Sequence, residues 1–213
     1  MKETPLRLPR LFAIIDVQLL ASRVPPEKLT GAVCDFAAEL AAAGVTFFRY
    51  DGEGISAREM LSHARELRRV LGPEAVLIMN SRADLCLAAG FCGVHLGVGE
   101  LSPEGARKVI GADRWMGISA STPDQARHAG STADYVAIGP VYSNAGRNPD
   151  RSVGLEGVSA ARNRTSTPLV AFGGINRANA RAVIEAGADS VAVRGDLMQN
   201  PRRAAEEFLA ILV

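Results

Sequence analysis

Residues 169–175 read LVAFGGI and residues 190–195 read SVAVRG, so two short apolar runs each end at a glycine. Glycine has no Cβ, and backbone N–H groups at such a strand end can approach a ligand closely. A stretch with helical periodicity separates the two runs. In (β/α)8 barrels, phosphate groups bind in the loops after strands seven and eight. We therefore expect Gly173, Gly174 and Gly195 to form a phosphate cradle for a small phosphorylated molecule.

The same alternation of short apolar runs and helical stretches extends along the whole chain. The runs are mostly apolar rather than alternating, as in parallel strands that helices cover. They fall at residues 11–16, 45–51, 75–80, 93–98, 115–120, 135–141, 169–175 and 190–194. Clear helical stretches are residues 27–43, 57–71, 177–186 and 201–212.

Eight such units predict an α/β protein with a single-domain (β/α)8 TIM barrel over residues 11–213, preceded by an N-terminal tail over residues 1–10. A doubly wound open sheet is the alternative. However, no Gly-x-Gly-x-x-Gly motif follows the first run.

Composition narrows the class of protein. The 213 residues carry a formal net charge of +1 and are 47% hydrophobic, which indicates neither a nucleic-acid partner nor a membrane surface. No apolar run approaches the roughly 18 residues of a membrane span, and the N-terminus lacks a signal-peptide core. Three cysteines in apolar surroundings fit free thiols in a reducing cytoplasm. We expect a cytoplasmic protein, and a homo-oligomer is compatible with this sequence.

Three predicted helices carry proline at their first position. Ser102, Thr122 and Asn200 precede these prolines, and each has a side chain suited to cap a helix N-terminus. Thr122 and Gln125 also have the spacing of a capping box.

Polar side chains follow the predicted strands, where barrels place their active-site groups. Those that follow the first five strands are Asp16, Arg49, Asp51, Glu53, Asn80, Arg82, Glu100, Ser119 and Ser121. The longest polar loop, residues 142–151, contains Arg147, a candidate clamp for an anion. The three histidines suggest no triad or metal cluster, and His95 is expected to lie in the core or to support the site.

Six strings occur in order along the chain: AIID (13–16), MNSRADL (79–85), GVHLG (93–97), GIS (117–119), ADYVAIGPV (133–141) and VAFGGI (170–175). This succession resembles thiamine phosphate synthases and their TenI-type relatives. The resemblance implies a TIM barrel that joins a pyrimidine methyl pyrophosphate to a thiazole phosphate, with Mg²⁺ assistance. It implies that the phosphate cradle, together with Arg194, holds the thiazole phosphate. Ser119 matches the serine near the reacting centre, and Asn80 matches the asparagine of an Ile-Asn-Asp motif.

The chain departs from this family where the resemblance places pyrophosphate. Synthases carry Gln-Leu-Arg-x-Lys after the second strand, whereas residues 49–53 read RYDGE. Acids, Asp51 and Glu53, thus stand at both cationic positions, and Arg49 remains as a candidate phosphate ligand. Two unit charges about 4 Å apart interact by ~4 kcal/mol at an effective dielectric near 20. The substitutions therefore predict weak or absent coupling activity.

The metal positions of the family are altered as well. The aspartate expected after Asn80 is Ser81, and the second metal aspartate matches Glu100. Asp51, Glu53 and Glu100 could together form an oxygen site for Mg²⁺, which prefers carboxylates and keeps several waters. Glu100 and Asp51 are accordingly the candidate metal ligands.

The leading interpretation is a divergent family member that binds thiazole phosphate in thiamine biosynthesis. One alternative is a TenI-type thiazole tautomerase, whose proton-moving histidine aligns with Ser121, so that Glu53 or Glu100 would have to act as the base. A second is a non-catalytic thiazole-phosphate binder. A third, a phosphosugar isomerase barrel, explains the cradle but not the ordered strings.

Overall fold

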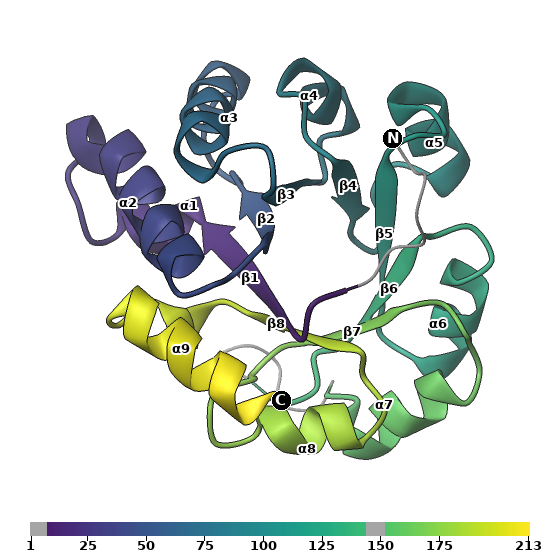
Figure 1. Cartoon of the computed structure of the whole chain (residues 1–213). Helices are drawn as coiled ribbons and strands as arrows, with labels where there is room; N and C mark the ends of the chain where they lie inside the picture. Colours follow the sequence, from purple (N-terminus) through teal and green to yellow (C-terminus); the bar gives the residue numbers. More distant parts are fainter. Residues whose placement is uncertain (1–7, 144–151) are drawn as a thin grey trace.

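The computed structural model describes residues 8–143 and 152–213, which form a closed barrel of eight parallel strands (Figure 1). The strands are Leu11–Asp16 (β1), Phe47–Asp51 (β2), Val76–Asn80 (β3), Gly93–Leu96 (β4), Trp115–Ala120 (β5), Tyr135–Ile138 (β6), Leu169–Phe172 (β7) and Ser190–Val193 (β8). Each strand pairs with the next along the chain, and β8 pairs with β1 to close the ring. The predicted TIM barrel is confirmed.

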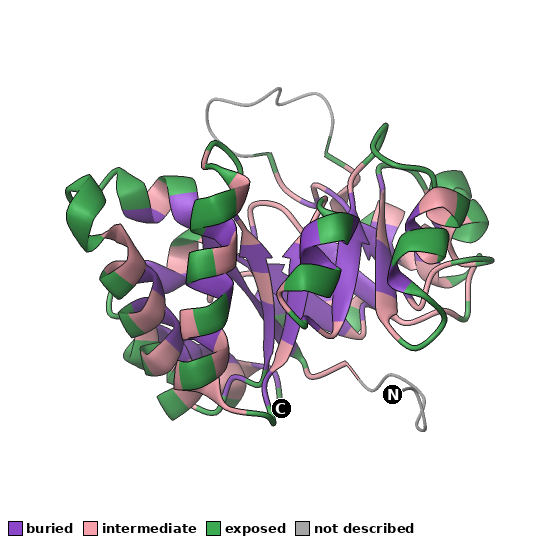
Figure 2. Ribbon diagram, turned by 90° about the horizontal axis from the view of Figure 1, so that it is seen from above, coloured by how far each residue is buried: buried purple, intermediate pink, exposed green. Residues whose placement is uncertain are grey.

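Helices surround the strands, with exposed outer faces and buried inner faces (Figure 2). The α-helices are Val17–Ala21 (α1), Leu29–Ala42 (α2), Ala57–Leu71 (α3), Ala83–Ala88 (α4), Pro103–Ile110 (α5), Pro123–Ala129 (α6), Gly154–Arg162 (α7), Ala180–Glu185 (α8) and Pro201–Ile211 (α9). Among the described residues, the short 3-10 helix Pro26–Lys28 (η1) precedes α2, and another, Gly195–Leu197 (η3), follows β8. In the part of the chain that the structure describes, no helix has the length and apolar character that crossing a bilayer requires.

Alternation along the strands sorts their side chains into two apolar clusters, because successive residues point to opposite faces. The larger cluster lies between the strands and the helices. The smaller one fills the barrel interior around Phe12, Phe47 and Tyr135, whose rings meet edge to edge or edge to face at centroid distances of 4.5–6.5 Å. Gly117 makes room for Tyr135, since a Cβ there would lie 2.0 Å from the ring carbon Cζ. These rings form a packed floor beneath the polar end of the barrel.

Two of the three predicted caps are present. Ser102 Oγ accepts from the Gly105 amide at 3.1 Å, and Thr122 Oγ1 accepts from the Gln125 amide at 3.2 Å. The predicted capping box is only half formed, because the Gln125 side chain accepts from the Ser121 amide instead of the Thr122 amide. Asn200 was expected to cap α9 but is left-handed (φ 50°) and makes no side-chain cap bond.

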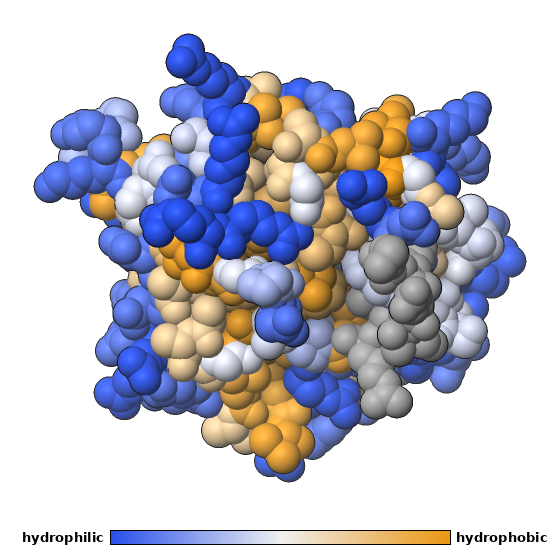
Figure 3. Space-filling view, turned by 45° about the horizontal axis from the view of Figure 1, so that its top comes forward, coloured by the Kyte–Doolittle hydropathy of each residue, from blue (hydrophilic) through white to orange (hydrophobic). Residues whose placement is uncertain are grey.

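The N-terminal residues that the structure describes are fastened to the barrel. The Arg10 carbonyl accepts from the Val191 amide at 2.9 Å, and Leu8 packs against the interior cluster. On the face shown in Figure 3, hydrophilic residues form most of the projecting periphery and hydrophobic residues gather near the middle.

Candidate functional site

At the carboxyl ends of the strands, the inward positions change from apolar to polar. Ile14, Phe47 and Ile78 belong to the interior cluster, and a period of two places the polar residues that follow them on the same side. We call the opening that these residues surround the mouth; its inward polar residues are Asp16, Arg49, Asp51, Asn80, His95, Ser119 and Arg194. The register of the strands places polar residues of adjacent strands beside each other: Asp16 on β1 lies beside Asp51 on β2, and Asn80 on β3 lies beside His95 on β4.

A buried hydrogen-bond chain runs across the floor of the mouth. The Tyr135 hydroxyl lies 3.1 Å from His95 Nδ1, and His95 Nε2 lies 2.9 Å from Ser119 Oγ. The two rings stack with centroids 5.7 Å apart, and both residues are almost completely buried. Burial, and then the charge of Arg49, hold the pKa of His95 well below its usual value, so the imidazole is neutral. Sequence reasoning found Ser119 but not the part played by Tyr135.

Arg49 brings a guanidinium to the mouth from β2. Its Nε is buried and has no hydrogen-bond partner among the described residues. Burial lowers the pKa of Arg49, opposed by Tyr135 and Asp51. Leaving a buried charged donor unsatisfied is costly, more so than for a neutral group. The arrangement therefore suits an anion that would accept from Arg49.

Arg194 is paired across the seam that closes the barrel. Its Nη1 lies 3.0 Å from Asp16 Oδ2. Asp16 is 6% exposed, and its other oxygen caps α1 by accepting from the Leu19 amide at 2.9 Å. The Arg194 guanidinium therefore already has a carboxylate partner, and in the predicted cradle we expect the backbone turn that Arg194 shares with Gly195 to matter more than this side chain.

The structure brings the two glycine turns of the cradle to adjacent strand ends. Strands β7 and β8 pair with Phe172 beside Ala192, so Gly174 and Arg194 lie two residues beyond the same register point. Around Gly195, a Cβ would meet nothing within 4 Å. The space beside this residue is open.

The two glycines that follow β7 are required for a different structural reason from the one expected. Gly173 and Gly174 have φ angles of 92° and 64°, a region that favours glycine. A Cβ on Gly173 would lie 2.4 Å from Pro140 Cβ, and one on Gly174 would lie 2.7 Å from Tyr142 Cβ. Their missing side chains therefore admit the loop after β6, whereas the open approach is at Gly195.

At each of the two turns, one backbone donor has no acceptor in the part of the protein that the structure describes. Within the described residues, the amides of Gly174 and Gly195 donate to no backbone or side-chain oxygen. Asn179 Nδ2 holds the Gly174 carbonyl at 3.0 Å. Arg177 holds Asp196 through Nε at 3.0 Å and Nη2 at 3.2 Å, which ties the loop after β7 to the one after β8. Unused N–H groups in two cross-linked turns suit a phosphate.

A second set of contacts links the ends of β3 and β4. Asn80 Nδ2 donates to Ser81 Oγ at 3.1 Å, and Ser81 Oγ donates to Glu100 Oε1 at 2.6 Å. The Gly97 amide donates to the other carboxylate oxygen at 2.7 Å. Ser81 is left-handed, with φ 62°. Glu100 is thereby oriented by the loops around it.

The carboxylates do not assemble a metal site on their own. Over residues 8–143 and 152–213, no three His, Cys, Asp or Glu side chains lie close enough to hold an ion, so Asp51, Glu53 and Glu100 do not form the expected three-carboxylate group. Mg²⁺ commonly takes one or two carboxylates together with substrate phosphates. Glu100, fixed at the mouth, and Asp51 fit that arrangement. Burial raises the pKa of Asp51 despite the nearby Arg49.

The remaining predicted residues lie at the edge or outside the described part. Ser121 is exposed, and its amide donates to Gln125 Oε1 at 2.7 Å. Arg147 lies outside the described residues.

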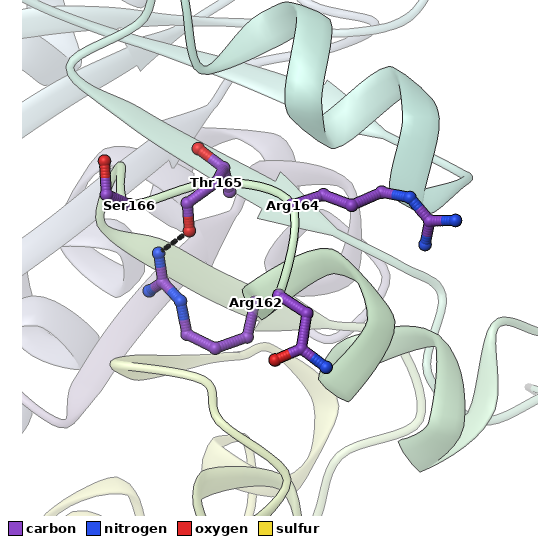
Figure 4. Close-up of a pocket in the computed structure, with 5 residues that line it drawn as sticks. Arg162, Arg164, Thr165 and Ser166 are labelled. Carbon is purple, nitrogen blue, oxygen red and sulfur yellow. Dashed lines mark hydrogen bonds between the residues drawn. The ribbon is translucent and has the colours of Figure 1, made fainter.

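Two cavities lie on opposite sides of the barrel. One of about 490 Å³ adjoins the mouth between the loop after β4 and α6, and its lining includes Glu100, Ser119 and Gln125. The other, about 580 Å³, lies where α7 leads into β7, at the strand's amino end. Figure 4 shows Arg162 there, donating to the Thr165 carbonyl. Arg162 also pairs with Asp189, which gives it a structural role there.

Comparison with known proteins identifies the family of this chain. A family model described as thiamine monophosphate synthase matches residues 23–197. A thiamine-phosphate synthase of Koribacter versatilis is 52% identical over 97% of both chains, and one of Moorella thermoacetica is 35% identical over 86% of this chain and 85% of its own. A solved thiamine phosphate pyrophosphorylase from Pyrococcus furiosus has a TM-score of 0.82 and 29% identity over 95% of each chain. The chain belongs to the thiamine monophosphate synthase family of thiamine biosynthesis.

Proposed function

We propose that the protein binds a thiazole phosphate at the mouth, with the phosphate at the cradle of Gly173, Gly174, Arg194 and Gly195. The observation that carries this proposal is the pair of unused amides, Gly174 and Gly195, at adjacent strand ends. Family membership supports the thiazole part, because the relatives are named for thiamine-phosphate synthesis.

For the second substrate, we propose a pyrimidine pyrophosphate that is coupled slowly. Arg49 presents an unsatisfied donor to an anion, and Ser119 lies in the same inward layer. Against this, Asp51 and Glu53 stand where the family resemblance places cations. Like charges oppose the pyrophosphate and raise the free energy of its complex.

Magnesium would be held by Glu100 and Asp51 and would arrive with the pyrophosphate. A bound ion would neutralise negative charge on that leaving group. Meanwhile, Arg49 would donate to a phosphate oxygen and Asn80, through Ser81, would keep Glu100 in place.

Titration calorimetry with thiazole phosphate tests the binding step, and a coupling assay with the pyrimidine pyrophosphate and Mg²⁺ tests turnover separately. We expect saturable binding of thiazole phosphate and turnover well below about 1 s⁻¹, the lower end of the usual enzyme range. No binding at millimolar thiazole phosphate would contradict the site assignment. A turnover near 1 s⁻¹ or above would contradict slow coupling and would identify an efficient synthase, as the names of the relatives suggest.

A thiazole tautomerase is the second candidate, favoured by Asp51. This carboxyl is half-buried and its pKa is raised, mainly by burial, which makes it a better proton acceptor than an exposed aspartate. Ser121, which aligns with the proton-moving histidine of TenI-type tautomerases, is an exposed hydroxyl. Incubation with the thiazole carboxylate phosphate in D₂O, followed by NMR, detects this activity, and an Asp51→Asn variant should abolish it. Binding of thiazole phosphate without either reaction would instead identify a non-catalytic binder.

A further inference from the structure

The chain of Tyr135, His95 and Ser119 has a direction that its partners determine. Tyr135 is 0% exposed, and its hydroxyl has one partner among the described residues, His95 Nδ1 at 3.1 Å. If Nδ1 carried the proton and donated to Tyr135, the phenolic proton would have no acceptor in a fully buried place. A buried donor without an acceptor is strongly disfavoured. The hydroxyl therefore donates to Nδ1.

The proton of His95 then sits on Nε2. A neutral imidazole has one donor and one acceptor nitrogen, so accepting at Nδ1 makes Nε2 the donor. Nε2 lies 2.9 Å from Ser119 Oγ, and this contact occupies a lone pair of the hydroxyl. The proton of Ser119 has no acceptor among the described residues. It is free for a ligand in the mouth, where Ser119 is half-buried among the inward polar residues.

We propose that Tyr135 and His95 act as positioning residues that make Ser119 an obligatory hydrogen-bond donor to an oxyanion of the ligand. An oxyanion fits better than a neutral acceptor because Arg49, in the same inward layer, has a buried Nε without a partner. The inference rests on the proposed function for the identity of the ligand, but the direction of the chain does not depend on it.

Gly117 links this arrangement to the sequence. Only a residue without a side chain leaves room there for the Tyr135 ring, which must cross the barrel interior to reach His95. The hydroxyl of Ser119 is thus made a hydrogen-bond donor by three residues on neighbouring strands, Gly117 on β5, Tyr135 on β6 and His95 on β4.

The first experiment determines the tautomer of His95 in the ligand-free protein. Nitrogen-15 chemical shifts of the His95 ring distinguish a protonated Nε2 from a protonated Nδ1. We expect protonation at Nε2 in the wild-type protein and a shift toward a mixture of tautomers in Tyr135→Phe, which removes the donor to Nδ1. Protonation at Nδ1 in the wild type would overturn the proposal whatever the protein binds.

The second experiment measures the affinity for inorganic pyrophosphate. Ser119→Ala removes the donor and should weaken binding about tenfold, whereas Ser22→Ala, which removes an exposed hydroxyl on α1's C-terminal side, should leave it unchanged. Unchanged affinity in Ser119→Ala, or no binding by the wild type, would overturn donation to an oxyanion. Thiazole phosphate is titrated in parallel, so a failure of the cradle is seen as a separate result.

A matched pair of substitutions at His95 separates positioning from packing. In His95→Gln the amide can reach Ser119, as Nε2 does, whereas in His95→Asn it can reach only Tyr135. We expect His95→Gln to keep pyrophosphate affinity within about threefold and His95→Asn to lose as much as Ser119→Ala. Equal losses in two variants that keep the wild-type near-ultraviolet circular dichroism would contradict the positioning role. If neither variant folds, the tautomer measurement decides.

Discussion

Replacing Gly195 by alanine adds one methyl group at the open side of the cradle. A Cβ at this position meets no atom within 4 Å, and the backbone there is not in the left-handed region that excludes side chains. The folded protein should therefore accept the methyl group without strain, and loss of chain entropy in the unfolded state should even raise stability by up to about 1 kcal/mol. A phosphate that approaches the Gly195 amide would instead meet the methyl group.

The expected loss of affinity follows from the bond that is obstructed. A hydrogen bond to a charged group contributes about 1.5–3 kcal/mol, so thiazole phosphate should bind roughly 10- to 150-fold more weakly to Gly195→Ala. Titration calorimetry gives the affinity, and urea unfolding gives the stability. Gly31→Ala on α2 is a matched control, because its Cβ also meets nothing within 4 Å and the residue lies on an outer helix rather than at a strand end. Affinity within twofold of wild type in Gly195→Ala would refute the assignment of the cradle.

Three other predictions concern charge, metal and pH. In metal-free buffer, Asp51→Asn should bind pyrophosphate roughly 5- to 30-fold more tightly than the wild type, because a unit charge about 8 Å away costs ~2 kcal/mol at a dielectric near 20. Glu53→Gln, whose side chain is exposed to solvent, should change the pyrophosphate affinity less than threefold. Lower affinity in Asp51→Asn would contradict this prediction. Chelation of divalent ions should abolish coupling but leave thiazole-phosphate binding intact. If calorimetry showed that thiazole-phosphate binding is lost along with coupling, the result would count against separate subsites. His63 is buried against the Tyr50 hydroxyl, 2.9 Å away, and burial lowers the pKa of His63, so its protonation favours the unfolded state. Urea unfolding should therefore show a free energy of unfolding that is maintained above about pH 6.5 and declines below it. The decline should be shallower in His63→Gln. An identical decline in that variant would exclude His63 as a cause.

Much of the barrel could be predicted because its strands are short, apolar and regularly spaced. β1 and β5 have the expected bounds, and α3 begins and ends where its periodicity does. The expected ends of β4, β6 and β7 were too late, since apolar residues continue past the last paired position into the mouth loops. Apolar character records burial rather than strand pairing. Val141 and Ile175 are buried beyond the ends of β6 and β7, whereas Val98, after β4, is 65% exposed.

The candidate site could be predicted only where a residue's role depends on its place at a strand end. Ser119 and Asn80 were identifiable in that way, and both lie at the mouth. Tyr135 was not, because it lies at the start of β6 and reaches His95 only across the barrel interior. The pairing of Arg194 with Asp16 joins residues at opposite ends of the sequence, and only closure of the barrel brings them together.

The most direct test of the thiazole-phosphate site is a crystal structure of the protein soaked with thiazole phosphate. We predict phosphate density within hydrogen-bond distance of the Gly174 and Gly195 amides, with the thiazole ring directed into the mouth toward Ser119. Phosphate density elsewhere, or an empty mouth at saturating ligand, would contradict the account.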